Sequence, residues 1–422
     1  CWRNELGLHH RKCDLTGEGI VSLYSSDKSY KVYSQNAWWS DEWDPLSYGR
    51  DVDFDRPFFP QFEELLWVVP IVSSVVINSE NSSFNNYCAH CKDCYMNVRL
   101  ADSRDAYYSY LVLDSENCVD CSFIASCHHC YGVLDCENCY RSKHSHNCRN
   151  CQDVSYCKDC VGCKNCFLCV GLNNQEYCVQ NKKYAPEEYT KKVYELLSRD
   201  PEKVLRDMLA SIPHREHENM NCENVVGNHL KNSQDLYHAF DSQDLKKGKY
   251  LIGWELWEHQ YDTDFWYRGS FTYDMISVYV SNNVFFSYWA YDSSFVWYSF
   301  QVNGARNAFG CANLKKWNNC ILNTSYSRSE YEQLAGKLVD HMWSTWEWGE
   351  FFPHEMSPFG YNETVAHEPY PLTRGDVENR GWKWFWEKDR TYSWTAYQPL
   401  SIDQYDEAVV GAQQAKENIQ KC

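Results

Sequence analysis

The fold is decided by the stretch from Cys118 to Cys139, which reads CVDCSFIASCHHCYGVLDCENC. Its cysteines form CxxC pairs, and such pairs continue at short intervals of 9, 9, 12, 9 and 9 residues. A short period with one three-residue insertion is typical of a solenoid, and two intervals of nine predict a coil of about 18 residues. The pairs begin at Cys118, Cys127, Cys136, Cys148, Cys157 and Cys166.

Asparagine and aspartate lie just before or within these pairs. Both residue types tolerate a left-handed backbone and bond to their own main chain, which favours corners. The residues concerned are Asn117, Asp120, Asp135, Asn138, Asn147 and Asn150.

The repeat ends in a cap that occurs twice. The segment from Phe167 to Tyr184 reads FLCVGLNNQEYCVQNKKY, and that from Phe309 to Tyr326 reads FGCANLKKWNNCILNTSY. Their cysteines, asparagines and tyrosines match at one constant offset, which indicates an internal duplication. We expect helices over 186–197 and 201–212 after the first cap, and over 329–342 after the second.

The second copy has no cysteine between Cys222 and Cys311. We interpret the aromatics in its place as pointing inward, where they would fill the coil. Outward-pointing Trp and Tyr in 254–300 would instead form a face for carbohydrate or a protein partner. The aromatics are Trp266, Tyr267, Phe271, Tyr273, Tyr279, Phe285, Phe286, Tyr288, Trp289, Tyr291, Phe295, Trp297, Tyr298 and Phe300.

The sequence thus predicts a mainly β chain with two tandem β-solenoid (β-helix-like) repeats, each closed by a short cap and a helix. A mixed α/β region precedes them, with strands over 20–24 and 30–33 in a hairpin and a short helix over 57–67. A Trp- and Pro-rich wrap over 346–395 and a helix over 403–420 follow. The predicted segments are 1–77, 78–215, 216–345 and 346–422.

Charge and hydropathy exclude some functions. The 422 residues carry a formal net charge of −18, so we expect no nucleic-acid partner, and we read Lys246, Lys247 and Lys249 as a solvated turn. No apolar stretch is long enough for a membrane span. We expect a cytoplasmic protein, although a removed signal peptide stays open because the chain begins at Cys1.

Several longer motifs resemble a bacterial cysteine-rich repeat family found mostly in uncultured lineages. The resemblance covers most of the chain and implies no activity, since the family has no established function. The motifs are Lys12-Cys-Asp-Leu-Thr-Gly17, Trp38-Trp-Ser-Asp41, Arg56-Pro-Phe-Phe59, the cysteine repeats, Glu347-Trp-Gly-Glu-Phe-Phe-Pro353, Ser357-Pro-Phe-Gly-Tyr-Asn-Glu-Thr364 and Arg380-Gly-Trp-Lys-Trp384.

The resemblance also implies zinc-ribbon-like CxxC elements on both sides of the solenoid. This chain departs from that pattern, because it begins after the first ribbon and ends at Cys422. Cys13 could be a remaining ribbon ligand, with His9, His10 and Cys1 as its nearby candidates. Without a CxxC partner, we expect Cys13 not to bind metal.

Three roles for the repeated cysteines stay open, and we rank metal binding first, a column of buried thiols second and disulfides third. Zinc is the first candidate metal, and the three-residue spacing after Cys157 also resembles an iron–sulfur pattern. We expect His128, His129, His144 and His146 at the surface. The candidate ligands are Cys118, Cys121, Cys127, Cys130, Cys136, Cys139, Cys148, Cys151, Cys157, Cys160, Cys163, Cys166 and Cys169.

No phosphate-binding, dinucleotide-binding, metalloprotease or serine-hydrolase motif occurs in the chain. We therefore expect a non-enzymatic repeat scaffold or binding protein that binds zinc. Its partner would be a protein, a second copy of the chain or a carbohydrate. The alternatives are a structural solenoid with a buried thiol column and an aromatic binding face, and a thiol-redox or iron–sulfur protein.

Overall fold

The computed structural model describes residues 2–5, 7–253 and 255–386, without the side chains of 255–257 and 265–267. The described chain forms two compact units, residues 74–214 and residues 2–73 with 215–386. It is mainly β, with 40% strand and 19% helix, and forms a β-solenoid of about 20 turns across residues 76–321. The predicted fold class is confirmed, while the helix expected over 403–420 lies outside the described residues.

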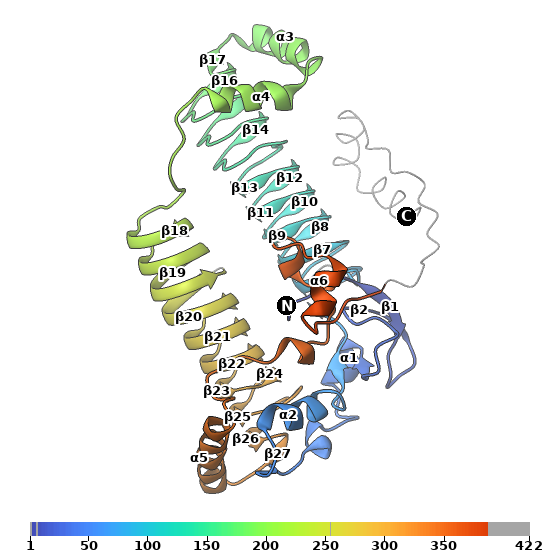
Figure 1. Ribbon diagram of the computed structural model, residues 1–422. Helices are drawn as coiled ribbons and strands as arrows, with labels where there is room; N and C mark the ends of the chain where they lie inside the picture. The colour runs from blue at the N-terminus through green and yellow to red at the C-terminus, as the bar shows by residue number, and fades with distance from the viewer. Residues whose placement is uncertain (1, 6, 254, 387–422) are drawn as a thin grey trace. The chain divides into compact units, whose positions relative to one another are not determined.

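The first solenoid is built from short parallel strands (Figure 1). Their registers join residues 12 positions apart, as in Cys118 with Cys130 and Ile124 with Cys136. The coil therefore has 12 residues, and the predicted 18 is wrong. The strands are β5 Val76–Ile77, β6 Asn85–Ala89, β7 Asn97–Ala101, β8 Arg104–Tyr107, β9 Tyr110–Leu113, β10 Glu116–Val119, β11 Ser122–Ala125, β12 His128–Tyr131, β13 Leu134–Glu137, β14 Gln152–Ser155, β15 Lys164–Phe167 and β16 Glu176–Val179.

The repeating unit of the coil is three residues. Almost every third residue has a positive φ, as in Asn117, Asp120, Phe123 and Ser126. A left-handed residue bends the chain sharply. The next residue points inward, as the buried Cys118 and Cys121 do. Twelve residues in units of three make a coil with four short sides. Asparagine and aspartate occupy many of these corners, as the sequence predicts, and glycine occupies others.

Each inward residue faces the inward residues of the coils before and after it, so the interior consists of four columns. Small polar side chains in them complete the main-chain hydrogen bonding. The Ser109 hydroxyl accepts a hydrogen bond from the Cys121 amide at 3.0 Å and donates one to the Tyr107 carbonyl at 2.8 Å. Such partners remove the cost of burying main-chain groups in a narrow interior.

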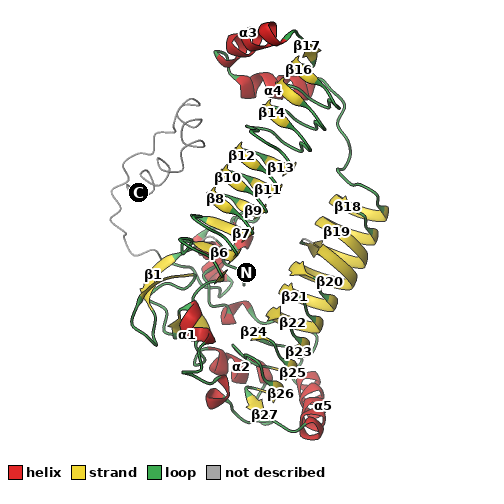
Figure 2. Ribbon diagram, turned by 180° about the vertical axis from the view of Figure 1, so that it is seen from behind, coloured by secondary structure: helices red, strands yellow, loops and turns green. Residues whose placement is uncertain are grey.

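The first solenoid ends in a hairpin and two helices. Strand β17, Lys182–Lys183, turns back antiparallel onto β16, and α3, Pro186–Leu197, with α4, Pro201–Ala210, follows. Proline at the first position of each helix has no amide hydrogen to leave unpaired. Leu196 of α3 packs with Tyr156, Phe167 and Val179 over the last coils. Figure 2 shows this end of the solenoid.

The second solenoid has the same 12-residue register, apart from a bulge between Val226 and Gly227. It ends in the matching hairpin and in α5, Arg328–Ser344, whose Ser327 and Glu330 form a capping box. The strands are β18 Glu223–Lys231, β19 Gln234–Ile252, β20 Glu255–Tyr267, β21 Ser270–Tyr279, β22 Asn282–Tyr291, β23 Ser294–Trp297, β24 Phe300–Asn303, β25 Arg306–Phe309, β26 Asn318–Ile321 and β27 Thr324–Ser325.

The N-terminal region packs against this second solenoid. Strand β1 pairs antiparallel with β2, whereas β3 pairs parallel with β4, so the hairpin predicted between 20–24 and 30–33 is wrong. A helix forms over 58–66, as predicted. The elements are β1 His9–Lys12, β2 Gly19–Ser22, β3 Val32–Tyr33, α1 Gln35–Trp39, η1 Pro45–Tyr48, α2 Phe58–Leu66 and β4 Ile71–Val72.

Helix α2 approaches the solenoid where the second cap begins. The ring of Phe58 lies against Gly310, where an added Cβ would come within 2.7 Å of it. Gly310 also has a φ of +62°, so glycine suits both the corner and the close approach. Phe58 packs against Tyr298 and Phe309, which belong to the same buried cluster.

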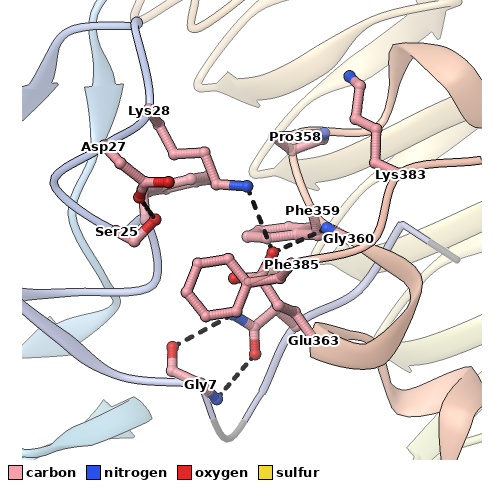
Figure 3. Close-up of polar contacts among 12 residues, drawn as sticks. Gly7, Ser25, Asp27, Lys28, Pro358, Phe359, Gly360, Glu363, Lys383 and Phe385 are labelled. Carbon is pink, nitrogen blue, oxygen red and sulfur yellow. Dashed lines mark hydrogen bonds and ion pairs between the residues drawn. The ribbon is translucent and has the colours of Figure 1, made fainter. Parts of the chain in front are cut away.

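The segment 346–386 wraps over the N-terminal region. It contains η2 His354–Met356, η3 Tyr361–Glu363, η4 Val365–His367 and α6 Arg374–Asn379. The buried Glu363 carboxylate accepts a hydrogen bond from the Gly360 amide at 2.7 Å and faces Lys28 at 3.4 Å (Figure 3). This contact joins the wrap to the N-terminal region.

We expect Glu347→Ala to lower the free energy of unfolding of the full chain by about 3 kcal/mol. The buried Glu347 carboxylate accepts hydrogen bonds from the Phe58 and Phe59 amides at 2.7 and 2.6 Å, at the start of α2. Its removal leaves two buried donors without this acceptor. Urea unfolding followed by tryptophan fluorescence measures the change. The exposed Glu350 is the matched control, and equal losses in Glu350→Ala and Glu347→Ala would contradict the prediction.

Candidate functional site

The cysteines predicted as ligands all point into the first solenoid, where none is more than 2% exposed. Cys178 belongs to the same buried cluster, and the sequence prediction missed it. The four columns read Cys88-Leu100-Val112-Ile124-Cys136-Cys148-Cys160-Leu172, Cys91-Ser103-Ser115-Cys127-Cys139-Cys151-Cys163, Cys94-Ala106-Cys118-Cys130-Ser142-Val154-Cys166-Cys178 and Asn85-Asn97-Ser109-Cys121-Val133-Ser145-Cys157-Cys169.

Except for Cys163, the thiols from Cys118 to Cys178 form one series of linked neighbours, which we call the thiol column. Cys118 hydrogen bonds to Cys121 in its own coil and to Cys130 in the next. Cys130 in turn contacts Cys127, and Cys127 contacts Cys139. The links then run through Cys136, Cys151, Cys148, Cys160, Cys157, Cys169 and Cys166 to Cys178.

Main-chain groups surround each sulfur in the same way. The Cys118 thiol lies 3.5 Å from the Glu116 carbonyl and 3.4 Å from that of Cys127, to which it can donate. The amide one coil further on points at the sulfur, as the Ser142 amide does toward Cys130. Cysteine therefore fits this interior as serine does, as a small side chain with a weak donor and a weak acceptor.

The neighbours share protons rather than titrate alone. Hydrogen bonds from Cys118 and Cys127 lower the pKa of Cys130 to about 6, and the same contact raises the pKa of Cys118. Burial is the main cause that raises the pKa of Cys163 to about 11, and no thiol donates a hydrogen bond to it. The column therefore behaves as a coupled set of sulfurs.

Among the described residues, no group of three or more His, Cys, Asp or Glu side chains is arranged to hold a metal ion. The sulfurs follow one another along the column instead of converging on one point, as four-thiolate zinc would require. Zinc and iron–sulfur binding therefore stay predictions. All the described cysteines are free, so no disulfide forms among them.

The four histidines near the pairs lie outside the coil. His146 pairs with Asp135 at 2.9 Å, and His144 stacks on Tyr156 with ring centroids 4.7 Å apart. His128 is exposed and His129 half-buried. None of them reaches the thiol column, and the expectation of surface histidines is confirmed.

Cys13 lies in the N-terminal region, which belongs to a different compact unit from the thiol column. Burial raises its pKa, but hydrogen bonds from Thr16 and the Ser34 amide outweigh that effect and lower the pKa overall. The Ser34 amide lies 3.2 Å from its sulfur. His9, a candidate co-ligand, instead faces Glu363 at 3.6 Å. Cys13 thus has local hydrogen-bond partners and no described ligand set.

The interpretation that aromatics fill the coil of the second copy is wrong for every predicted ring whose side chain the structure describes. Every predicted aromatic with a described side chain lies at an outward position, whereas Val284, Ser287 and Val296 lie inward. Trp266 and Tyr267 fall outside the described side chains. Outward rings stack one coil apart, as Tyr279 does on Tyr291 with centroids 4.8 Å apart and planes 3° apart.

Part of this outer surface is covered by the N-terminal region. Tyr288, Tyr298 and Phe300 are buried against it, and Trp289 and Trp297 are half-buried at its margin. The uncovered part, which we call the open aromatic face, includes Tyr279 and Tyr291, which are 41% and 36% exposed. The other exposed rings, Tyr237, Tyr250, Phe271, Tyr273 and Phe295, lie at other register positions and do not belong to this face.

A groove of about 460 Å³ lies along the early coils of the second solenoid. Lys247 and Lys249 line it from strand β19, so these lysines are solvent-exposed as expected but lie in a strand and not in a turn. Neither lysine has an ion-pair partner among the described residues, and tyrosine rings flank them. The groove is lined by Asn224, Val226, Asp235, Leu236, Tyr237, Lys247, Gly248, Lys249, His259 and Tyr261.

The comparisons with known proteins add no family. No family model matches the chain, and no curated protein matches it. Over the described residues, none of the helices combines the length and apolarity needed to span a membrane.

We expect the free energy of unfolding to fall as the pH rises from about 8.5 toward 12, and to fall less in Cys320→Val. Burial raises the pKa of Cys320 to about 12, so the unfolded chain loses this proton first. Each such thiol contributes a slope of up to about 1.4 kcal/mol per pH unit.

Urea titrations at several pH values measure the difference in slope. Valine already fills the same column at Val296 and Val284, so Cys320→Val keeps the packing. Val296→Ala is the control, since it lowers stability equally at every pH. Identical slopes for the parent chain and Cys320→Val would contradict the assignment.

Proposed function

We propose that the chain is a non-enzymatic scaffold that binds an extended carbohydrate through the open aromatic face. The observation that carries this proposal is the outward direction of the aromatic rings. Apolar ring faces left in solvent are costly in a single chain and usually mark a binding surface. A solenoid repeats such rings at a fixed spacing, which suits a polymer that also repeats.

The chemistry of the face supports a sugar ligand. Sugars present apolar ring faces that stack on aromatics, and hydroxyl groups that bond to polar neighbours. Asp292 directly follows Tyr291, and Asn283 lies one coil before Phe295, so both provide polar side chains at outer positions near exposed rings. The net charge of −18 opposes binding of nucleic acid.

The thiols support an intracellular place for this scaffold. A buried set of free cysteines persists most readily where disulfides are kept reduced. Equivalent repeated thiols differ from one tuned reactive thiolate, which favours the scaffold over the redox alternative.

We expect the double variant Tyr279→Ala with Tyr291→Ala to lose at least about tenfold in affinity for a polysaccharide. Affinity electrophoresis against a panel of neutral and acidic soluble polysaccharides measures the loss. Tyr279→Phe with Tyr291→Phe keeps the rings and should keep binding. Tyr194→Ala is the matched control, because Tyr194 is 72% exposed on α3, in the other unit.

Trp289 and Trp297 are poorer test positions, since their loss would also disturb the packing of the N-terminal region. The proposal fails if no polysaccharide retards the parent chain, or if Tyr194→Ala weakens retardation as much as the double variant. Capture of a protein that depends on Tyr279 and Tyr291 would indicate a protein ligand for the same face.

A further inference from the structure

The first solenoid concentrates thiols beyond what its fold requires. The second solenoid has the same 12-residue coil, yet Val296, Ser299 and Val302 occupy its interior. Within the first, Val112 and Ser115 fill the columns as well as cysteine does. Packing alone therefore does not account for the run of sulfurs from Cys118 to Cys178.

The donors of the thiol column are sulfur alone. Its buried neighbours are Ala, Val, Leu and Ile side chains, with Ser and Asn in the same columns. No inward position from Asn85 to Cys178 holds a charged residue or a histidine. An ion bound in this interior must be coordinated by thiolates alone, without nitrogen or carboxylate ligands. The complex of ion and thiolates must also carry little net charge, because the interior is apolar.

Zinc meets these conditions poorly. Four thiolates around one divalent ion leave two negative charges, and the interior has no cation to balance them. A singly charged thiophilic ion that bridges neighbouring thiolates leaves a chain close to neutral. Such ions accept few ligands, so they need no cluster of three or more side chains around a point. The column supplies neighbouring sulfurs within a coil and between coils, as at Cys118, Cys121 and Cys130.

We propose that the thiol column is a multinuclear site for copper(I) or a similar monovalent thiophilic ion, held between neighbouring sulfurs along the solenoid. The step is an exchange without redox change. Each thiol that becomes a ligand releases its proton, and a sulfur–copper bond replaces the sulfur–hydrogen bond. This site is separate from the open aromatic face, so either proposal can fail alone.

The test uses the full chain, reduced and handled without oxygen. Copper(I) is supplied as its acetonitrile complex against bathocuproine disulfonate as competitor. We expect uptake approaching roughly one ion for each column thiol, the release of one proton for each ion bound and the emission typical of copper(I) thiolates. Because the sulfurs are buried, copper(I) should bind faster during refolding than to the folded chain. X-ray absorption of the loaded parent chain should show sulfur as the only first neighbour.

A variant interrupts the column with residues that the columns already contain. Cys127→Ser, Cys130→Ala, Cys136→Val and Cys139→Ser copy Ser115, Ala106, Val112 and Ser103. We expect this variant to bind roughly a third fewer ions, in proportion to the thiols and links removed. The control changes Cys311→Ser and Cys320→Val in the second solenoid and should bind as the parent does. Far-ultraviolet circular dichroism checks that both fold.

Three results would overturn the proposal. They are failure of the parent chain to compete with the chelator, nitrogen or oxygen neighbours around copper, and uptake of zinc in preference to copper(I). If the interrupted variant does not fold, the neighbour analysis of the loaded parent chain decides alone. Loss of polysaccharide binding in the tyrosine variants has no bearing on these readouts.

Discussion

A left-handed residue at almost every third position is the constraint on which both solenoids depend. It allows the chain to close a coil in only 12 residues, and each side of that coil sends one side chain inward. Most inward positions hold small or aliphatic side chains such as Cys, Ser, Ala, Val and Leu. The aromatic rings of the second copy whose side chains the structure describes lie on the outside.

The sequence predicted the solenoid, its duplication and its caps, because cysteine pairs and cap motifs recur at regular offsets. It misled on the coil length because the pairs mark only some inward positions. Intervals of nine and twelve are both multiples of three, and the true repeat passes through Ser103, Val112 and Ile124 as well as through cysteines. The three-residue period shared by these intervals, together with Asn, Asp and Gly at many third positions, could have predicted the three-residue unit of the coil.

That signal is diluted because corners also accept other residues, such as Phe123, Tyr156 and Val280. The direction of the aromatics was harder to predict. Strand alternation has a period of two, whereas this coil has a period of three, so alternating rings suggested a half-buried strand. The exposure of Tyr279 and burial of Tyr288 depend on the N-terminal region, and no local pattern encodes that packing.

The two solenoids show how one backbone can hold very different interiors. Serine hydroxyls and cysteine thiols occupy equivalent places beside the same main-chain groups, as at Ser109 and Cys121. The backbone geometry thus leaves the chemistry of the columns free to vary. The columns of the first copy are rich in cysteine, whereas those of the second hold mainly small apolar and hydroxyl side chains. Residues that could bind a partner lie at the outer positions.

The N-terminal region packs on the second solenoid, which lies far from it in sequence. Trp2 contacts Phe300 and Phe352, and Glu347 caps the helix that begins at Phe58. During synthesis on the ribosome, these early rings must wait for some 300 further residues before their partners emerge. The first solenoid has only local neighbours to find and can form in that interval, coil by coil. The N-terminal region, which is synthesised first, can therefore finish packing only after the second solenoid has been synthesised.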